Sequence, residues 1–300
     1  MNLRQLECFV AVVDEGSFTR GARALGITQP SLSQHIRSLE RELDGAVLER
    51  LPRGVALTPA GRTLLPEARA AVRAVDRGRR GARAALALEA GELEIATVLS
   101  MAVGLLPRYI RMWHERYPRV GIRLQEFRHR SLLEDAVEQG VADFAIGPLP
   151  LRAWEGPLEI VSWEEFVVVL PPDDPLAGRQ ALRLEELADR EWVLYHPDHG
   201  LAGVLDEVCR RAGFSPRGSV RTSQAEGGAR LASAGLGPAL VPHNIVLPGI
   251  DGSVVRLSPR TVRDVAAYAR TDWSPTAAAF VEVLREARQP PPRGAVSIHL

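Results

Sequence analysis

The first residues of the chain show apolar positions at the spacing of helices, interrupted by short turns. Apolar side chains recur every three to four positions from Leu3 to Val13, and Gly16 supplies the residue that often ends such a helix in a left-handed conformation. Ser17 is a typical N-cap for a second helix over residues 18–25, which Gly26 closes. The pattern therefore predicts two short helices joined by a tight turn.

A third and a fourth helix follow, separated by a short extended segment. Thr28 caps the third helix, whose apolar stripe is Leu32, Ile36, Leu39 and Leu43. Residues 47–57 contain the turn 52–54 and predict a short β-ribbon. Thr58 and Pro59 open a long helix to about residue 88. Its narrow apolar face of small residues favours pairing with a second copy of the chain, and packing against the protein's own domains is the alternative.

From Gly91 the pattern changes to alternating strands and helices, which is typical of an α/β domain. The expected strands cover residues 93–97, 120–127, 143–146, 158–170, 192–195, 220–222, 239–241 and 265–270. The expected helices cover residues 105–116, 132–139, 201–212, 226–234 and 276–288. The tail from residue 289 contains three successive prolines and is expected to be loose.

Composition and charge narrow the class of protein. The chain has 300 residues, of which 46% are hydrophobic and 25% charged, as in ordinary globular proteins. The net charge of zero divides into +4 for residues 1–90 and −4 for the rest. The chain contains arginine but no lysine, which excludes Schiff-base and P-loop chemistry that depends on a lysine. No apolar leader or membrane-length run is present, so we expect a cytoplasmic protein without a membrane partner.

Cysteine usage excludes further organising principles. Cys8 and Cys209 are far apart in sequence and neither belongs to a CxxC motif, so a disulfide framework or a cysteine-based zinc site is not expected. Both lie at apolar helical positions, where a buried and unreactive thiol is the ordinary state. We expect no metal and no cofactor.

The polar face of the third predicted helix carries groups that read DNA. At 100° per residue, Pro30, Gln34, Arg37 and Arg41 lie opposite the apolar stripe, with Ser33 on the flank. Amide, hydroxyl and guanidinium groups bind base edges and phosphates. The order of cap, short helix, turn, cap and longer helix is that of a helix-turn-helix, which predicts double-stranded DNA as a partner.

A long ordered set of residues resembles the LysR-type transcriptional regulators. In the first part it comprises 22–25 (ARAL), 29–33 (QPSLS), 36–40 (IRSLE), Arg50, Arg53, Gly54 and 57–61 (LTPAG). In the second part it comprises 105–107 (LLP), 140–146 (GVADFAI), 174–177 (DPLA), 212–214 (AGF) and 234–237 (AGLG). The resemblance covers about residues 2–288.

The resemblance implies a fold and a domain organisation. Residues 1–58 would form an N-terminal all-α winged helix-turn-helix and residues 59–90 a linker and dimerisation helix. Residues 91–300 would form an α/β effector-binding domain of two periplasmic-binding-protein-like subdomains. The first subdomain would hold about 91–160 and 265–300, and the second about 161–264, with a small-molecule effector between them. The family also implies a homodimer or homotetramer.

The same resemblance implies the DNA contacts. The third helix would enter the major groove with Gln29, Pro30, Ser31, Ser33, Gln34 and Arg37 near the bases. Arg50 and Arg53 would bring the wing onto phosphate. The chain departs from the family at Asp44, where glycine is usual, so the turn into the wing would use Asp44 or be rebuilt around Gly45. It also departs at Leu48, where phenylalanine is usual, and at Gln34, where arginine is frequent.

Candidate effector-binding residues follow the predicted strands of the second part. Ser100 comes after the first strand, at the place where, by the resemblance, the family's ligands commonly meet a hydroxyl and a helix N-terminus. Backbone N–H groups there favour a carboxylate, and a plain helix cap is the alternative. Arg128, His129 and Arg130 follow the second strand and would favour an acidic effector, unless they form a solvated charge run. The loop that contains them, residues 127–131, is about one residue longer than is usual in the family.

The second predicted subdomain contributes two histidines and an acidic residue. His196 and His199 lie in a loop after a strand, where lining of the cleft is a better interpretation than metal ligation without a third ligand. Glu226 opens a helix near the same cleft, and a charge at the helix N-terminus explains it equally well.

A competing interpretation assigns the chain to another functional class. It would be an α/β solute-binding or enzymatic module whose first ninety residues only mediate oligomerisation. The sequence shows no nucleophile–base pair, metal cluster or cofactor loop, so we expect no catalytic residues.

Overall fold

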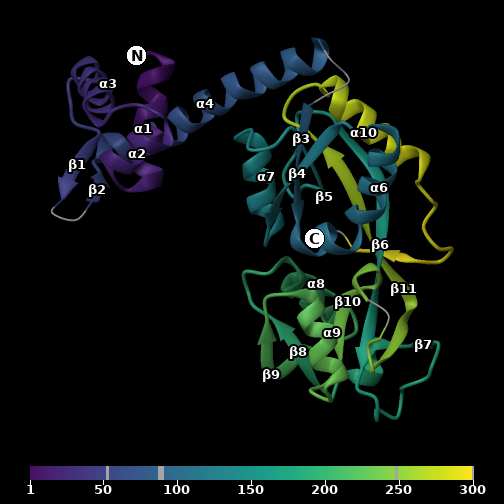
Figure 1. The fold of residues 1–300 in the computed structure, drawn as a ribbon. Coiled ribbons are helices and arrows are strands. Elements are labelled where there is room, and N and C mark those ends of the chain that lie inside the picture. Colours follow the sequence, from purple (N-terminus) through teal and green to yellow (C-terminus); the bar gives the residue numbers. More distant parts are fainter. Residues whose placement is uncertain (52–53, 87–90, 247–248, 299–300) are drawn as a thin grey trace. The chain divides into compact units, whose positions relative to one another are not determined.

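A computed structural model describes residues 1–51, 54–86, 91–246 and 249–298 (Figure 1). The chain divides into two compact units, residues 1–82 and 83–300, which are described separately. Among the described residues, none of the helices combines the length and the apolar character needed to span a lipid bilayer.

The first unit is a small helical domain with a β-hairpin. Its elements are α1 (Leu3–Glu15), α2 (Phe18–Ala24), α3 (Gln29–Glu42), β1 (Leu48–Leu51), β2 (Gly54–Leu57) and most of α4 (Pro59–Leu86). The predicted caps are confirmed, because the hydroxyl groups of Ser17 and Thr28 accept backbone N–H groups at the starts of α2 and α3. Gly16 ends α1 in the left-handed conformation. Helices α1, α2 and α3 pack around a buried core that includes Phe9, Leu32 and Leu39.

The turn after α3 distinguishes between the two alternatives for Asp44. Asp44 has a φ angle of +49°, which places it in the left-handed region, whereas Gly45 is not among the glycines with positive φ. The turn is therefore made by Asp44 itself, an acidic residue that tolerates this conformation better than most. Leu48, at the start of β1, is buried in the core of the unit.

The first half of α4 packs on its own unit. Ala68 is buried, and Leu64, Leu65, Ala71 and Val72 lie partly buried against the core of the helical domain. Val75, further along the same helix, is 41% exposed. Packing against the chain's own domain, the alternative to dimerisation, thus accounts for the apolar face up to Val72.

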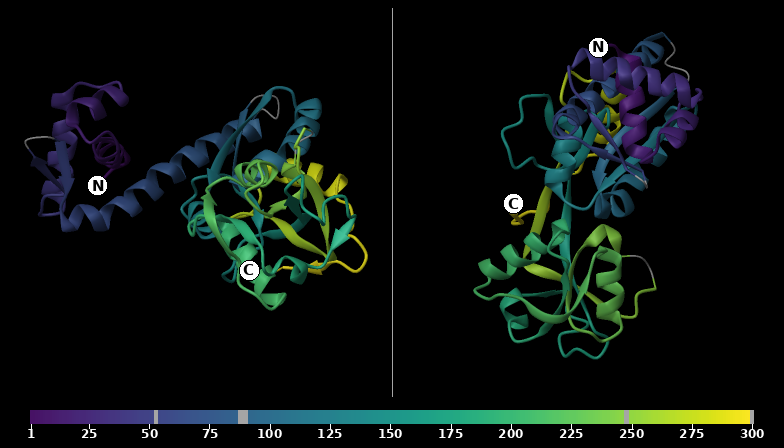
Figure 2. Two further views of the ribbon diagram at one scale, coloured as in Figure 1. Left: turned by 90° about the horizontal axis from the view of Figure 1, so that it is seen from below. Right: turned by 90° about the vertical axis from the view of Figure 1, so that its left-hand side faces the viewer.

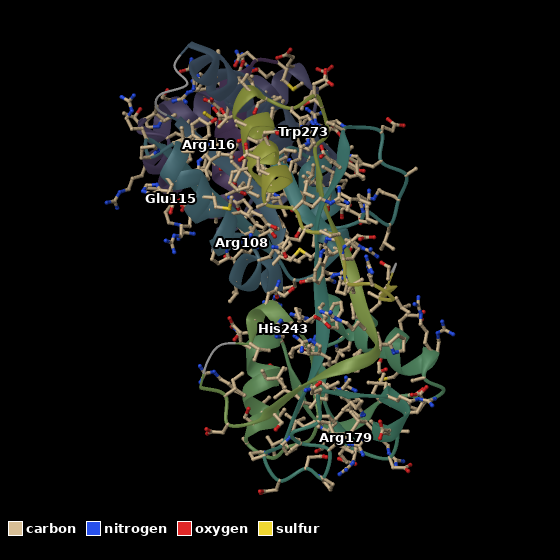
Figure 3. The ribbon with its side chains drawn as sticks, turned by 90° about the vertical axis from the view of Figure 1, so that its right-hand side faces the viewer. Arg108, Glu115, Arg116, Arg179, His243 and Trp273 are labelled. Carbon is tan, nitrogen blue, oxygen red and sulfur yellow. The ribbon has the colours of Figure 1, made fainter. Side chains whose placement is uncertain are left out.

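The second unit is built on a mixed sheet with the strand order β10-β6-β11-β5-β3-β4, and β7 and β12 also pair with β11. Its first subdomain contains β3 (Gly91–Val98), α5 (Leu99–Gly104), α6 (Leu106–Arg116), β4 (Val120–Phe127), α7 (Arg130–Glu138), β5 (Phe144–Pro148) and α10 (Pro275–Glu286). β3 is parallel to β4 and β5. Aromatic residues of α6 and α10, including Trp113 and Phe280, are buried in the core of this subdomain. Arg116, on α6, forms a two-point ion pair with Glu286 of α10 (Figure 3).

The second subdomain has a separate core. Its elements are β7 (Ala181–Leu182), the 3-10 turn η1 (Leu184–Leu187), β8 (Glu191–Tyr195), α8 (Gly200–Arg211), β9 (Arg217–Thr222), α9 (Ala225–Ser233), β10 (Ala239–Pro242) and η2 (His243–Ile245). β8 and β9 form a parallel pair. Trp192 and Tyr195 are buried among the side chains of α8 and α9.

Two long strands connect the subdomains, as the right-hand view of Figure 2 shows. β6 (Leu158–Leu170) and β11 (Ser253–Tyr268) run antiparallel and pair along most of their length. The prediction of a strand only over 265–270 was therefore wrong for the preceding part of β11. The strand pattern is obscured there because the register with β6 shifts between Arg256 and Thr261, and Pro259 falls inside that shift.

The prediction of a loose C-terminal tail was also wrong. After α10 the carbonyl of Gln289 accepts a hydrogen bond from the indole of Trp163. β12 (Val296–Ser297) then pairs with Thr261 and Val262 of β11. Ile298 is 2% exposed and lies in the core of the second subdomain. The tail thus begins at the first subdomain and ends at the second.

Candidate functional site

The third helix of the first unit presents a polar face to solvent. Leu32, Ile36 and Leu39 are buried against α1 and α2, which fixes the orientation of α3. Gln34 and Arg37, on the opposite side, are exposed. No shielding of these two side chains by other elements occurs in the described part of the unit. An exposed amide and guanidinium on a helix fixed in this way can reach base edges or phosphates.

The start of α3 holds a local hydrogen bond that the sequence analysis did not foresee. Gln29 is half-buried, and its Nε2 donates to the Ser33 hydroxyl over 2.9 Å. Ser33 is 5% exposed, so its side chain is not available at the helix surface for the base contact that was predicted. Its position, one turn after Gln29, lets it orient the Gln29 amide instead. Pro30 is exposed and Ser31 half-buried at the same helix end.

The predicted wing is present as the β1–β2 hairpin, in which Leu48 pairs with Leu57 and Arg50 with Val55. The backbone of Arg50 belongs to β1. The Arg50 side chain and the whole of Arg53 lie outside the described part of the structure. Their expected phosphate contacts stay predictions.

A cavity of about 220 Å³ lies between the two subdomains of the second unit. We call it the cleft cavity. Its lining includes five of the predicted effector-binding residues, namely Ser100, Arg128, His129, Arg130 and His199. The remainder is mostly apolar and comprises Val98, Leu99, Pro148, Leu151, Gly200, Leu201, Gly203 and Val204, together with Arg263.

Two histidines at the cavity act as helix N-caps. His129 Nδ1 accepts the Ser131 backbone N–H over 3.2 Å at the start of α7. His199 Nδ1 accepts the Leu201 N–H over 3.2 Å at the start of α8. A neutral ring whose Nδ1 accepts must carry its proton on Nε2. Each ring therefore offers an N–H donor beside a helix N-terminus, where partial positive charge favours an anion.

Backbone contacts bring these helix ends together across the cavity. The Gly200 N–H, at the start of α8, donates to the Arg128 carbonyl over 2.9 Å. On another edge α5 approaches η2, where a Cβ on Gly104 would lie 2.6 Å from Asn244 Oδ1. Figure 3 shows the neighbouring His243 on the side of the second subdomain that faces the first. The two subdomains are therefore in contact at the cleft cavity and also where α5 meets η2.

Burial controls the protonation of His199. The side chain is 4% exposed and stacks on Tyr195, with ring centroids 5.1 Å apart. Burial, together with the positive charge of Arg263 and the proximity of His129, lowers the pKa of His199 to about 4. The ring is therefore neutral at pH 7, as its capping role requires.

Replacement of His199 by asparagine is expected to flatten the pH dependence of stability. An unfolded histidine has a pKa of about 6.5, so below that pH the unfolded state takes up a proton that folded His199 does not. Stability should fall as the pH falls toward 4, by at most about 1.4 kcal/mol per pH unit from this group. Asparagine also caps helices but does not titrate. Urea unfolding at several pH values between 6.5 and 4.5 measures the difference, and equal slopes for both proteins would contradict the assignment.

The arginines around the cavity have different environments. Arg128 is exposed. Arg130 Nη1 donates to the Leu149 carbonyl over 2.8 Å, and its Nε lies 3.7 Å from Glu134 Oε1. Burial lowers the pKa of Arg130, and Arg263 adds to the effect. Arg263 was missed by the sequence analysis; it is 8% exposed and pairs with the buried Glu164. The signal that could have found it is the pair Glu164–Glu165 inside an apolar strand, because buried carboxylates require cationic partners.

The other predicted residues are divided between the cavity and the surface. Ser100 is the second residue of α5 and does not cap it, and no hydrogen bond of its hydroxyl to another described residue is present. His196 is exposed and lies beside Asp198, away from the cavity lining. Its neighbour Tyr195 points into the core, so strand alternation directs His196 outward. Glu226 lines a separate hollow with Arg230 and Asp251.

Neither cysteine has the environment of a reactive thiol. Cys8 and Cys209 are both fully buried. Burial raises the pKa of Cys209 to about 12, with a smaller contribution from Asp206. Within the described residues, no group of three histidine, cysteine or acidic side chains is placed to hold a metal ion.

Together, a helix-turn-helix unit and a two-subdomain binding unit define the class of ligand-responsive DNA-binding regulators. The profile "Bacterial regulatory helix-turn-helix protein, lysR family" matches residues 3–62, and "LysR substrate binding domain" matches residues 87–289. The chain belongs to the LysR family of transcriptional regulators. The first unit is thus a DNA-binding domain rather than a segment that only mediates oligomerisation.

Individual relatives agree with this assignment along the whole chain. The chain is 33% identical to the HTH-type transcriptional regulator BudR of Raoultella terrigena, covering 94% of this chain and 100% of that protein. It is 30% identical to the RuBisCO operon transcriptional regulator of Allochromatium vinosum, covering 96% and 97%. A solved structure of full-length OxyR from Pseudomonas aeruginosa matches with a TM-score of 0.70 and 26% identity, covering 95% and 94%.

Proposed function

We propose that this regulator reads operator DNA through the exposed face of α3 and responds to a small carboxylate in the cleft cavity. The observation that carries the first part is the exposure of Gln34 and Arg37 on a helix whose other face is buried. We assign residues 1–58 to DNA binding, 59–90 to the linker helix and 91–300 to effector binding. The protein acts as a homodimer or homotetramer in the cytoplasm and catalyses no reaction.

Within the DNA interface we propose two kinds of contact. Gln29, Gln34 and Arg37 approach bases, with Ser33 orienting the Gln29 amide, while Pro30 and Ser31 lie at the helix end that enters the groove. Arg50 and Arg53 bind phosphate through the wing. Base contacts determine the sequence preference, whereas phosphate contacts supply affinity that falls with salt.

The carboxylate assignment rests on the charges around the cleft cavity. Arg128, Arg130 and Arg263 line it, and among the described residues of its wall none is acidic. The N-termini of α7 and α8 also converge there, with His129 and His199 as caps. An anion binds such a set of donors through charge-assisted hydrogen bonds. A ligand that prefers one subdomain arrangement then shifts the regulator toward that arrangement.

Binding to duplexes enriched from a random pool tests the DNA contacts. Gln29→Ala is expected to lower the preference for one base over the others at one position of the operator by about 1–3 kcal/mol. The reason is that the hydrogen bonds from the Gln29 amide to an adenine are lost. Arg53→Ala is expected to weaken binding to enriched and scrambled duplexes alike and to reduce the salt slope by about one. Fluorescence anisotropy over a range of salt concentrations measures both effects.

The control for these variants is Arg111→Ala. Arg111 is an exposed arginine of α6 in the second unit, with 82% of its side chain accessible. Its removal changes the net charge as Arg53→Ala does but touches no proposed DNA contact. A Gln29 variant with unaltered sequence preference, or an equal effect of Arg111→Ala and Arg53→Ala, would refute the proposed interface.

A further inference from the structure

A buried ion pair joins β6 and β11, the two long strands that connect the subdomains, beside the cleft cavity. Arg263 of β11 lies opposite Glu164 of β6 in the strand register. Arg263 Nε donates to Glu164 Oε2 over 3.1 Å, and Nη2 donates to the same oxygen. Glu164 is 2% exposed, and among the described residues its Oε1 has no hydrogen-bond partner. The pair therefore uses one carboxylate oxygen and one edge of the guanidinium.

The orientation of Arg263 is fixed from a second direction. The guanidinium carbon lies 5.3 Å from the centroid of the Phe166 ring, which is fully buried. A cation over an aromatic face is attracted by the ring. Arg263 is thus held by Glu164 and Phe166 before any ligand arrives, and such preorganisation lowers the entropic cost of binding.

Arg263 is the most deeply buried of the three arginines that line the cavity, and it keeps donors that no described acceptor uses. Arg130 is also largely buried, but it donates to the Leu149 carbonyl and lies beside Glu134. Arg128 is exposed, so water competes for its donors. For Arg263, no described protein acceptor contacts Nη1, although the residue is 8% exposed and lines the cavity. A guanidinium has five N–H donors in a planar fork that matches a carboxylate.

The charge balance limits what the cavity can accept. Glu164 offsets Arg263, and Glu134 offsets Arg130. His199 is neutral at pH 7 because its pKa is about 4. Most of the remaining lining is apolar, including Leu99, Leu201 and Val204. One anionic group can share Arg263 with Glu164, whereas a second would lack a buried counter-charge.

We propose that Arg263 binds the carboxylate of a small monocarboxylate with an apolar body, and that Glu164 is a positioning residue that restricts the cavity to a single negative charge. This proposal rests on the proposed effector function of the cleft cavity. It adds a binding residue on β11, one of the two strands that connect the subdomains. It also gives a reason why the cavity would prefer a ligand with one carboxylate to a ligand with two.

Calorimetric titration of the full chain tests the role of Arg263. The probes are propionate, isovalerate and benzoate, each with its matched amide. The wild-type protein is expected to bind at least one acid and to prefer it over its amide by about 10- to 100-fold, the range for a charge-assisted hydrogen bond. The double variant Arg263→Gln with Glu164→Gln should lose this preference. It replaces the ion pair by two amides, so no buried charge is left without a partner.

The single variant Glu164→Gln tests the positioning role. Glutamine retains an acceptor for Arg263 but removes the negative charge. We expect malonate and succinate to gain about tenfold in affinity relative to the monocarboxylate, the size of one modest electrostatic interaction. A residue that served only to stabilise the fold would leave this ratio unchanged. Arg108→Gln, at an exposed arginine of α6 (Figure 3), is the control and should alter neither measurement.

Each outcome bears on the proposal. A double variant that retains the preference for acid over amide would overturn it, as would a wild-type protein that binds none of the acids. Sequence-specific DNA binding is measured on the same preparations. If it persists while the titrations fail, only the ligand assignment is wrong; if it is also absent, the proposed regulatory function fails with it.

Discussion

Replacing Glu134 with alanine is expected to destabilise the second unit by about 3 kcal/mol, because several groups lose a buried partner at once. Glu134 lies on α7 and its side chain is 1% exposed. Its Oε1 accepts the Leu151 N–H over 2.9 Å, and its Oε2 accepts Arg152 Nε over 3.0 Å. The Nε of Arg130 lies 3.7 Å from Oε1. These contacts hold one wall of the cleft cavity, so ligand affinity should fall as well.

Glu138→Ala provides the matched control. Glu138 is on the same helix and accepts from the same Arg152, with Nη1 2.9 Å from Oε2, but its side chain is 45% exposed. Its loss should cost at most about 1 kcal/mol. All five tryptophans lie between residues 113 and 273. Tryptophan fluorescence during urea unfolding therefore reports on the second unit alone, and equal losses for the two variants would argue against the anchoring role of Glu134.

Gly61→Ala is expected to destabilise the first unit by about 1–3 kcal/mol or more, the cost of inserting an atom where there is no room. Gly61 is buried in the first turn of α4. A Cβ there would overlap the Val47 carbonyl oxygen and lie 3.1 Å from Leu57 Cδ2. The backbone at Val47, just before β1, and the Leu57 side chain would have to shift, which would displace the wing.

Replacing Gly78 of the same helix with alanine is expected to stabilise the first unit rather than destabilise it. A Cβ on Gly78 would meet no atom within 4 Å. Alanine should therefore stabilise α4 by about 0.5–1 kcal/mol through its higher helix propensity. Hydrogen exchange of peptides from residues 1–82 measures both variants without interference from the second unit. Slower exchange in Gly61→Ala, or faster exchange in Gly78→Ala, would show that local space does not decide these positions.

The sequence was sufficient for the parts of the fold that local chemistry determines. Ser17 and Thr28 fix the starts of α2 and α3 by capping, and the stripe from Leu32 to Leu39 fixes the buried face. The exposure of Gln34 and Arg37 follows directly from that stripe. Several predicted effector-binding residues lie in the loops between a strand and the next helix. Those at the start of the helix line the cavity, as His129 and His199 do.

The remainder depends on contacts between distant segments. Arg263 acquires its position from Glu164, 99 residues earlier. The two glutamates inside an apolar strand indicate that a cationic partner exists, but nothing local in the sequence says which arginine it is. β12 becomes a strand only because β11 offers it an edge. His196 and Glu226 were assigned to the cleft by proximity in sequence, but the orientation of a strand end and of a helix start cannot be deduced without the packing of the core.

The C-terminal tail has a practical consequence for handling the protein. Residues after α10 run from the first subdomain to the β11 edge, and Ile298 is inserted into the second core. An added segment that displaced residues 296–298 would consequently disturb both the β11 edge and the second core. The opposite terminus offers no better location, because the Met1 amino group pairs with Glu42 at the end of α3. Preparations intended for ligand titration should therefore carry a protease-cleavable extension that is removed before use.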